Sequence, residues 1–162
     1  MRVLFIRHAA AADKSGFGGS DMDRPLTDDG RDEARRMFKA LARVYPRLDA
    51  VVSSQAVRAR ETADILSACF GKVGVAETAL LNPGCSWKEF RKVLGEVDRK
   101  HECIAVVGHE PDFSSILGAV VAGGQLRIDV KKASCIEADI NSIGKGELKL
   151  VLTPKIIAKL TE

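Results

Sequence analysis

The chain has 162 residues, of which 46% are hydrophobic and 29% charged, which suits one soluble domain with a substantial core. The formal net charge is +3, from 25 basic and 22 acidic residues, and this near balance argues against nucleic acid or a membrane surface as partner. No apolar stretch is long enough to span a bilayer, and the N-terminal apolar run is too short for a signal peptide, so we expect a cytoplasmic protein.

The first predicted element is a buried strand, Val3 to Ile6, which ends directly in Arg7 and His8. Arginine is rarely buried without a partner, so a strand that only packs has little reason to end in this pair. In open α/β sheets, ligands bind just beyond the carboxyl ends of the strands. The pair therefore indicates the entrance of a ligand site. A strand that reaches the protein surface and ends in polar residues would show the same sequence pattern.

A loop rich in glycine, serine and aspartate follows, and its glycines do not match a phosphate-cradling P-loop. We interpret it as a flexible surface loop near the site. Thr27 then caps a helix from about Asp28 to Val44, whose first turn carries acidic residues that the helix dipole favours. The apolar face of this helix comprises Ala34, Met37, Phe38, Leu41 and Ala42.

Strands and helices alternate along the rest of the chain. In order, the patterns predict a strand at 48–52, a helix at 56–70, a short strand at 73–78, a helix at 86–99, a buried strand at 103–107, a helix from Pro111 to about 122, strands at 135–140 and 148–152, and a helix at 154–160. This alternation favours a largely parallel sheet covered on both faces, with an antiparallel hairpin near the C-terminus. We therefore predict one three-layer α/β/α domain over residues 1–162.

The four cysteines argue against a metal site. None of them forms a CxxC pair or lies near a histidine at ligand spacing: Cys69, Cys85, Cys103 and Cys135. Buried reduced thiols are the simplest account of them.

Two of the three histidines, His8 and His109, directly follow strands predicted to be buried and parallel, so both should lie at the same edge of the sheet. Arg58 falls in the first turn of the helix after the second strand, close to that edge. Arg60, two residues further on, should point elsewhere. His101 sits in the charged stretch RKHE and is predicted to be a solvated loop residue.

One edge of the sheet thus collects a cationic group: Arg7, His8, Arg58 and His109. Guanidiniums offer planar paired donors that match phosphate oxygens, and imidazole serves as a nucleophile or proton carrier near neutral pH. Such an excess of positive groups suits a phosphoryl group better than a metal ion. The alternatives are purely structural: His109 would be a core histidine, and Arg58 would pair with Glu61 or Asp64 on the helix surface.

Four motifs occur here in one order: Arg7-His8 after the first strand, RPLT-x-x-G from Arg24 to Gly30, S-x-x-x-R-A-x-E-T-A from Ser54 to Ala63, and VVGH from Val106 to His109. Together they resemble the histidine phosphatase superfamily, also called phosphoglycerate-mutase-like, over nearly the whole chain. The short length, and Ala9 where many members carry glycine, look most like its SixA-type branch of phosphohistidine phosphatases.

The resemblance implies a role for each residue of the cationic group. His8 would be the nucleophile that becomes a transient phosphohistidine, Arg7 and Arg58 would hold phosphate oxygens, and His109 would bind the phosphoryl group and stabilise the transferring charge. Phosphoryl transfer depends mainly on positioning and charge stabilisation, so no metal or other cofactor is implied. Arg24 either closes one side of the pocket or anchors the loop to the first helix.

The sequence departs from the family at the general acid. Many members supply a glutamate after the third strand, where this chain has ETALLNPG with Leu80 or Leu81 at the aligned position. The candidate substitutes are Glu77, Glu110 and Asp112. A missing acid weakens the case for alkyl phosphate esters, whose alkoxide leaving groups need a proton, and it fits a P–N substrate better.

The leading hypothesis is a metal-independent phosphatase acting on phosphohistidine in a signalling or phosphotransfer protein, because the short chain also lacks the lid-forming insertions of larger relatives. One alternative is a phosphatase for small phosphate monoesters, phosphoanhydrides or nucleotides. Another is a non-catalytic module that binds phosphate or a phosphoprotein. A mutase is disfavoured, because it needs a more enclosed site. The sequence leaves the natural substrate, the partner and the oligomeric state open.

Overall fold

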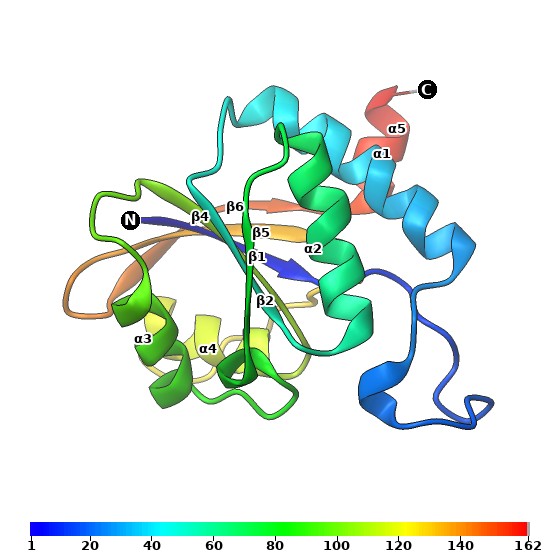
Figure 1. Cartoon of the computed structure of the whole chain (residues 1–162). Helices are drawn as coiled ribbons and strands as arrows, with labels where there is room; N and C mark the ends of the chain where they lie inside the picture. The colour runs from blue at the N-terminus through cyan, green and yellow to red at the C-terminus, as the bar shows by residue number, and fades with distance from the viewer. Residues whose placement is uncertain (162) are drawn as a thin grey trace.

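The computed structural model describes residues 1–161, and Glu162, the last residue of the predicted domain, lies outside them. Six strands form one sheet in the order β3-β2-β4-β1-β5-β6. The parallel strands are β1 (Arg2–Arg7), β2 (Ala50–Ser54), β3 (Val75–Thr78) and β4 (Cys103–Gly108). The antiparallel hairpin of β5 (Cys135–Ile140) and β6 (Gly146–Leu152) joins this sheet through β1 (Figure 1).

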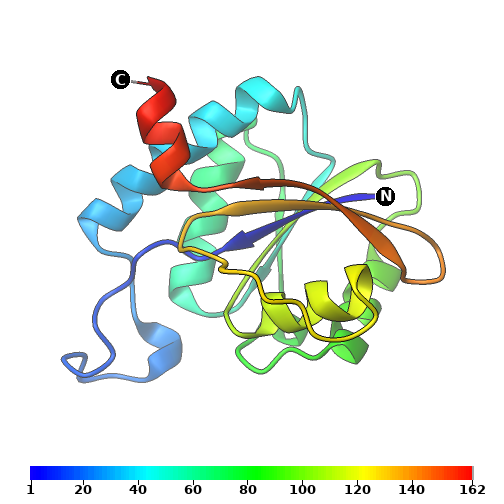
Figure 2. The ribbon, with the colours of Figure 1, turned by 180° about the vertical axis from the view of Figure 1, so that it is seen from behind.

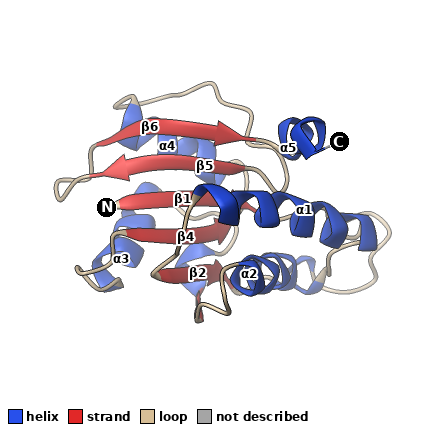
Figure 3. Ribbon diagram, turned by 90° about the horizontal axis from the view of Figure 1, so that it is seen from above, coloured by secondary structure: helices blue, strands red, loops and turns tan. Residues whose placement is uncertain are grey.

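Helices cover both faces of the sheet, which confirms the three-layer prediction. One face carries α1 (Asp28–Val44), α2 (Val57–Cys69) and α5 (Pro154–Thr161), and the other carries α3 (Trp87–Glu96) and α4 (Asp112–Val121) (Figure 3). Two short 3-10 helices, η1 (Asp21–Asp23) and η2 (Ala79–Leu81), lie in loops. None of the helices within residues 1–161 is both long and apolar enough to cross a membrane.

The central strand β1 divides its side chains between two cores. Leu4 and Ile6 belong to the core beneath α1 and α2, while Val3 and Phe5 belong to the core beneath α3 and α4. On the second side, Phe5 contacts the rings of Phe90 and Phe113 at centroid distances of 5.2 and 5.3 Å. Successive strand residues point to opposite faces, so an uninterrupted apolar run is what a strand covered on both faces requires.

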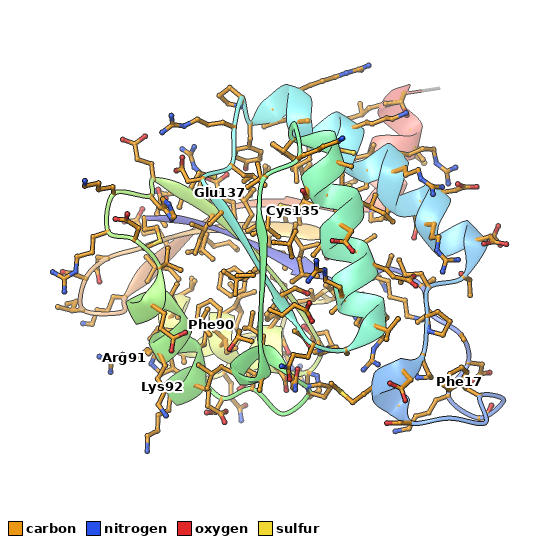
Figure 4. The ribbon with its side chains drawn as sticks, in the orientation of Figure 1. Phe17, Phe90, Arg91, Lys92, Cys135 and Glu137 are labelled. Atoms are coloured by element: carbon orange, nitrogen blue, oxygen red, sulfur yellow. The ribbon has the colours of Figure 1, made fainter. Side chains whose placement is uncertain are left out.

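The helix bounds follow local capping. Thr27 accepts a hydrogen bond from the backbone N–H of Gly30, and α1 has the predicted bounds. Ser86 and Glu89 form a capping box at the start of α3, where Phe90 turns inward and Arg91 and Lys92 project outward (Figure 4). α3 ends at Glu96 rather than at 99, because Val97 takes an extended conformation, and β6 begins at Gly146 rather than at 148. Ala42, predicted on the apolar face of α1, is only half-buried.

Strand register brings the two histidines together. β1 and β4 pair in parallel with Arg7 opposite Gly108, so His8 and His109 leave the sheet side by side. The backbone N–H of His8 then donates to the carbonyl of Gly108 at 3.1 Å. A side chain at position 108 would collide with the Phe113 ring, since a Cβ there would lie 2.7 Å from it. Gly108 therefore lets α4 pack close behind the site.

The cysteines have the predicted reduced state. All four are free; Cys85, Cys103 and Cys135 are buried, and Cys69 is half-buried. Burial raises the pKa of Cys85 to about 12, so this loop thiol is not an activated nucleophile.

Candidate active site

The residues expected at the sheet edge line one cavity of about 310 Å³. Arg7 and His8 reach it from the end of β1, Arg58 from the first turn of α2, and His109 from the residue after β4. Arg24 completes the set from the loop before α1. The ring centroids of the two histidines lie 5.3 Å apart.

His8 presents an unprotonated ring nitrogen, Nε2, to this cavity. Its Nδ1 lies 2.8 Å from the carbonyl oxygen of Ala9, and because a carbonyl only accepts, Nδ1 must carry the proton. Arg58 donates from Nε to His8 Nε2 at 3.4 Å. Burial, together with the charges of Arg58 and Arg7, lowers the pKa of His8 to about 4. At neutral pH the ring is therefore uncharged, and its Nε2 lone pair accepts a long contact from Arg58.

His109 has the opposite tautomer. Its Nδ1 lies 3.5 Å from Nη2 of Arg58, which only donates, and its Nε2 lies 2.8 Å from Oγ of Ser54. Nδ1 is therefore the acceptor and Nε2 carries the proton. Burial and the nearby His8 and Arg58 lower the pKa of His109 to about 3. Both rings are thus neutral.

Arg58 is buried and paired with a residue that sequence reasoning missed. Its Nη1 donates to the backbone oxygen of Asp21 at 2.6 Å, and its Nη2 lies 3.1 Å from the Asp21 carboxylate. The surface pairing considered for Arg58 is wrong, because Glu61 binds Arg31 and Asp64 binds Arg60. Arg60 points away from the cavity, as predicted. Nothing in the sequence of the η1 loop distinguishes Asp21 from its exposed acidic neighbours.

Arg7 lines the cavity and has one buried donor without a partner among the described residues. Its Nη1 donates to the backbone oxygen of Val130 at 2.7 Å, in the segment between α4 and β5 (Figure 2). Its Nε is buried and has no hydrogen-bond partner among residues 1–161. An unsatisfied buried donor is costly, so this atom favours an acceptor such as a phosphoryl oxygen.

Arg24 combines the two placements considered for it. It lines the cavity, and it also anchors its loop, because Nη1 donates to the backbone oxygen of Ala12 at 2.6 Å and Nε pairs with Asp21 at 3.0 Å. Two lysines that sequence reasoning missed, Lys14 and Lys132, line the cavity as well. Both belong to loops whose position depends on tertiary contacts, so no local pattern marks them.

Of the three candidate acids, only Glu110 lies at the cavity. Glu77 is exposed on β3 and pairs with Arg60. Asp112 is buried and accepts from the backbone N–H groups of Gly84 and Cys85, so it holds the loop before α3.

His101 does not join the site. It is half-buried rather than fully solvated, and it lines a larger hollow of about 850 Å³ together with Met1 and Arg2, at the opposite end of β1. That hollow mixes acidic and basic side chains, whereas the smaller cavity gathers the two other histidines with several cations. The smaller cavity is therefore the one equipped for phosphoryl chemistry.

Part of the sequence matches a protein-family model, and nearly all of it matches a relative. The model of the histidine phosphatase superfamily (branch 1) matches residues 3–82. An uncharacterized protein of Picosynechococcus sp. is 30% identical over 168 residues, which cover 96% of this chain and 98% of that protein.

Solved structures match nearly the full length. The protein histidine phosphatase SixA complexed with tungstate has a TM-score of 0.87 at 21% identity, covering 97% of this chain and 99% of that one. The putative phosphohistidine phosphatase SixA from Agrobacterium tumefaciens has a TM-score of 0.79 at 23% identity, covering 94% and 97%. At these identities the two structures establish the shared fold.

Proposed function

The chain belongs to branch 1 of the histidine phosphatase superfamily, with its phosphoglycerate-mutase-like fold, and is a phosphatase; we propose that it hydrolyses phosphohistidine on a signalling or phosphotransfer protein without a metal. One observation carries the proposal: His8 is neutral, with the Nε2 lone pair facing a cavity lined by guanidiniums. Such a ring is a nucleophile held among donors that match phosphate oxygens.

In the first step, His8 Nε2 gives its lone pair to phosphorus as the P–N bond of the substrate breaks. The bonding pair goes to the substrate's imidazole nitrogen, and that ring leaves neutral when its other nitrogen carries a proton. Arg7 and Arg58 hold the charge that accumulates on the phosphoryl oxygens. No acid from the enzyme is needed for this leaving group.

In the second step, water attacks phosphorus and the P–Nε2 bond to His8 breaks. The bonding pair returns to His8, which keeps its Nδ1 proton on the carbonyl of Ala9 and so leaves as a neutral ring. The hydrogen bond to Ala9 therefore serves both steps, because it maintains the only tautomer in which Nε2 can bond to phosphorus and depart again.

The site's carboxylates support a P–N substrate and a metal-free reaction. Glu110 accepts from the backbone N–H of Ser114 at one carboxylate oxygen, and its other oxygen lies 2.8 Å from the Ser114 hydroxyl, so this carboxylate is anchored to the first turn of α4 rather than standing free beside a leaving group. The carboxylate of Asp21 is engaged by Arg58 and Arg24. A divalent cation entering the cavity would meet mainly guanidinium and ammonium groups, which repel it.

A phosphatase for small phosphate monoesters is the second candidate. The position of Glu110 favours it, because this carboxyl lies at the cavity and would supply a proton to an alkoxide if it turned away from Ser114. The two candidates share the chemistry of His8 and differ only in the leaving group.

The test incubates the full-length protein with EDTA and a phosphotransfer domain carrying phosphohistidine, and in parallel with p-nitrophenyl phosphate. We expect loss of the phosphohistidine signal, abolished by His8→Ala and retained by His101→Ala, which alters a histidine outside the cavity. Turnover of only the small ester would show that the protein is a phosphatase for small phosphate monoesters. Binding without turnover of either substrate would indicate a non-catalytic module, and activity that survives His8→Ala would exclude the covalent mechanism.

A further inference from the structure

A chain of hydrogen bonds runs from His109 away from the cavity. Nε2 of His109 lies 2.8 Å from Oγ of Ser54, and that oxygen lies 3.0 Å from Oδ1 of Asn82. Ser54 is the last residue of β2 and is fully buried, while Asn82 follows η2. The reaction steps described above use neither residue.

The orientation of Asn82 is fixed by its other contacts. Its Oδ1 accepts from the backbone N–H of Gln55 at 2.9 Å, and its Nδ2 donates to the side-chain oxygen of Gln55 at 3.2 Å. A flipped amide would place two donors against each other at the first contact. The oxygen of Asn82 therefore faces Ser54 and accepts its proton.

This arrangement determines which nitrogen of His109 is protonated. The hydroxyl of Ser54 has one proton, given to Asn82, and two lone pairs, one of which accepts from the backbone N–H of Ala56 at 3.1 Å. The remaining lone pair requires a donor, so Nε2 of His109 must carry its proton. The Arg58 donor at Nδ1 leads to the same tautomer from the opposite side of the ring.

We propose that Ser54, supported by Asn82, is a positioning residue that keeps Nδ1 of His109 unprotonated at the cavity, where it exchanges its long contact with Arg58 for the proton of the water that hydrolyses the phosphoenzyme. The inference rests on the proposed function, since it assigns a proton acceptor to the second step. There the O–P bond forms, the P–Nε2 bond returns its electrons to His8, and the proton moves from water to Nδ1. The negative phosphoryl group beside His109 favours this protonation.

The first measurement needs no substrate. In the full-length protein labelled with ¹⁵N-histidine, we expect NMR to show the His109 proton on Nε2 at neutral pH. Ser54→Ala should give a mixture of tautomers, because the contact that remains, from Arg58 to Nδ1, is long at 3.5 Å and holds the ring only weakly. Ser53→Ala is the matched control, because Ser53 is an equally buried neighbour on β2 whose hydroxyl bonds only to the backbone oxygen of Ser54.

Two substitutions at position 82 test the support for Ser54. Asn82→Asp retains an oxygen that accepts from Ser54 and should keep the wild-type tautomer. Asn82→Leu removes the acceptor and should resemble Ser54→Ala. A merely structural role for Asn82 would make the two variants alike.

The second measurement follows loss of the phosphoryl group from phosphorylated His8. We expect Ser54→Ala to slow this step by about 10- to 100-fold, part of the effect that a positioned proton carrier supplies, while Ser53→Ala stays near wild type. Wild-type His109 protonated on Nδ1, or equal behaviour of the two serine variants in both measurements, would overturn the inference. An inactive protein that shows the expected tautomers would overturn the proposed function while supporting the positioning by Ser54.

Discussion

Each histidine of the cavity donates from one ring nitrogen to the protein, and its other, unprotonated nitrogen has only a long contact with Arg58, at 3.4 or 3.5 Å. His8 donates from Nδ1 to a backbone carbonyl, and His109 donates from Nε2 to a buried hydroxyl. Burial removes water from both rings, and the guanidinium of Arg58 between them disfavours a further positive charge. The site therefore holds neutral imidazoles beside charged arginines.

The first prediction concerns titration of these rings. We expect NMR titration to show His8 and His109 still neutral at pH 6, because their pKa values are lowered to about 4 and about 3. Inorganic phosphate should raise both values, since a bound anion favours the charged ring. Protonation of either ring near the ordinary pKa of 6.5 without phosphate would contradict the lowered pKa values of His8 and His109.

The same shifts predict how stability depends on pH. The folded-state pKa values lie below the unfolded value of 6.5, so the unfolded chain binds protons first, and the free energy of unfolding falls as pH drops below 6.5. Between pH 6.5 and 5 the loss is roughly 2 kcal/mol for each histidine. Urea unfolding at the two pH values measures it. A His109→Gln variant should lose less unfolding free energy between the two pH values than the wild type does. An equal loss would show that His109 does not contribute to the pH dependence.

Arg58 and Arg60 provide a matched pair on one helix. Arg58→Ala should lower kcat/KM by about 100-fold or more, because a buried donor to the phosphoryl group is lost. Arg58→Lys should recover little of the activity, since an ammonium lacks the planar fork. Arg60→Ala should stay near wild type, because Arg60 binds Asp64 and Glu77 outside the cavity. Equal losses in the two alanine variants would assign Arg58 a structural role only.

At the scale of elements, the start of α1 is held against the segment that follows β1. The backbone N–H of Thr27 donates to the carbonyl of Ala10 at 2.9 Å, and Gly30 lies against the same carbonyl. A Cβ at Gly30 would lie 2.2 Å from that oxygen, far inside van der Waals contact. The glycine of the RPLT-x-x-G motif thus serves close packing beneath the site.

Gly30 makes this contact and Gly95 makes none, so substitution by alanine should change stability in opposite directions at the two positions. Gly30→Ala should lower the free energy of unfolding by about 1–3 kcal/mol or more, the usual range for overpacking, because the obstructing atom belongs to the backbone. Gly95→Ala in α3 meets no atom within 4 Å and should raise stability by up to about 1 kcal/mol through helix propensity. Thermal and urea unfolding of both variants test the pair, and a neutral Gly30→Ala would show that α1 can shift.

At the scale of the whole molecule, the formal net charge is only +3, but positively charged side chains are concentrated at the cavity. Lys14 and Lys132 line the cavity beside its arginines, and neither forms an ion pair with a described residue. The charge of Lys132 also contributes to the lowered pKa of His8. A positive rim of this kind attracts substrates that carry negative charge beyond the phosphoryl group itself.

Lys132→Glu should therefore lower kcat/KM for a phosphorylated protein with acidic residues near its phosphohistidine, and the difference from wild type should shrink with added salt. Lys131→Glu is the control, because Lys131 pairs with Asp129 and does not line the cavity. Steady-state rates at low and high ionic strength check the prediction. Identical rates for the two variants would show that Lys132 has no role in recognising the substrate.

Much of the fold and the central site follow from local patterns. The apolar runs that end in Arg7-His8 and in Gly108-His109 predict parallel strands whose ends meet, and Thr27 predicts the start of α1. These features depend on residues close together in the chain, because strand burial and helix capping are local in sequence. The placement of two arginines and two histidines at one edge of the sheet is thus present in the sequence, whereas the neutral state of both histidines is not.

Only the tertiary structure decided what surrounds those residues. It paired Arg58 with Asp21, placed Val130 against Arg7 from 123 positions away, and turned His109 toward Ser54. It also selected Glu110 among three candidate carboxyls and brought Lys132 to the rim. Hydrogen bonds form or fail within tenths of an ångström, and the loops that carry these partners are placed by packing rather than by their own composition. The sequence determined which groups meet, and folding determined the tautomer, charge and partner of each.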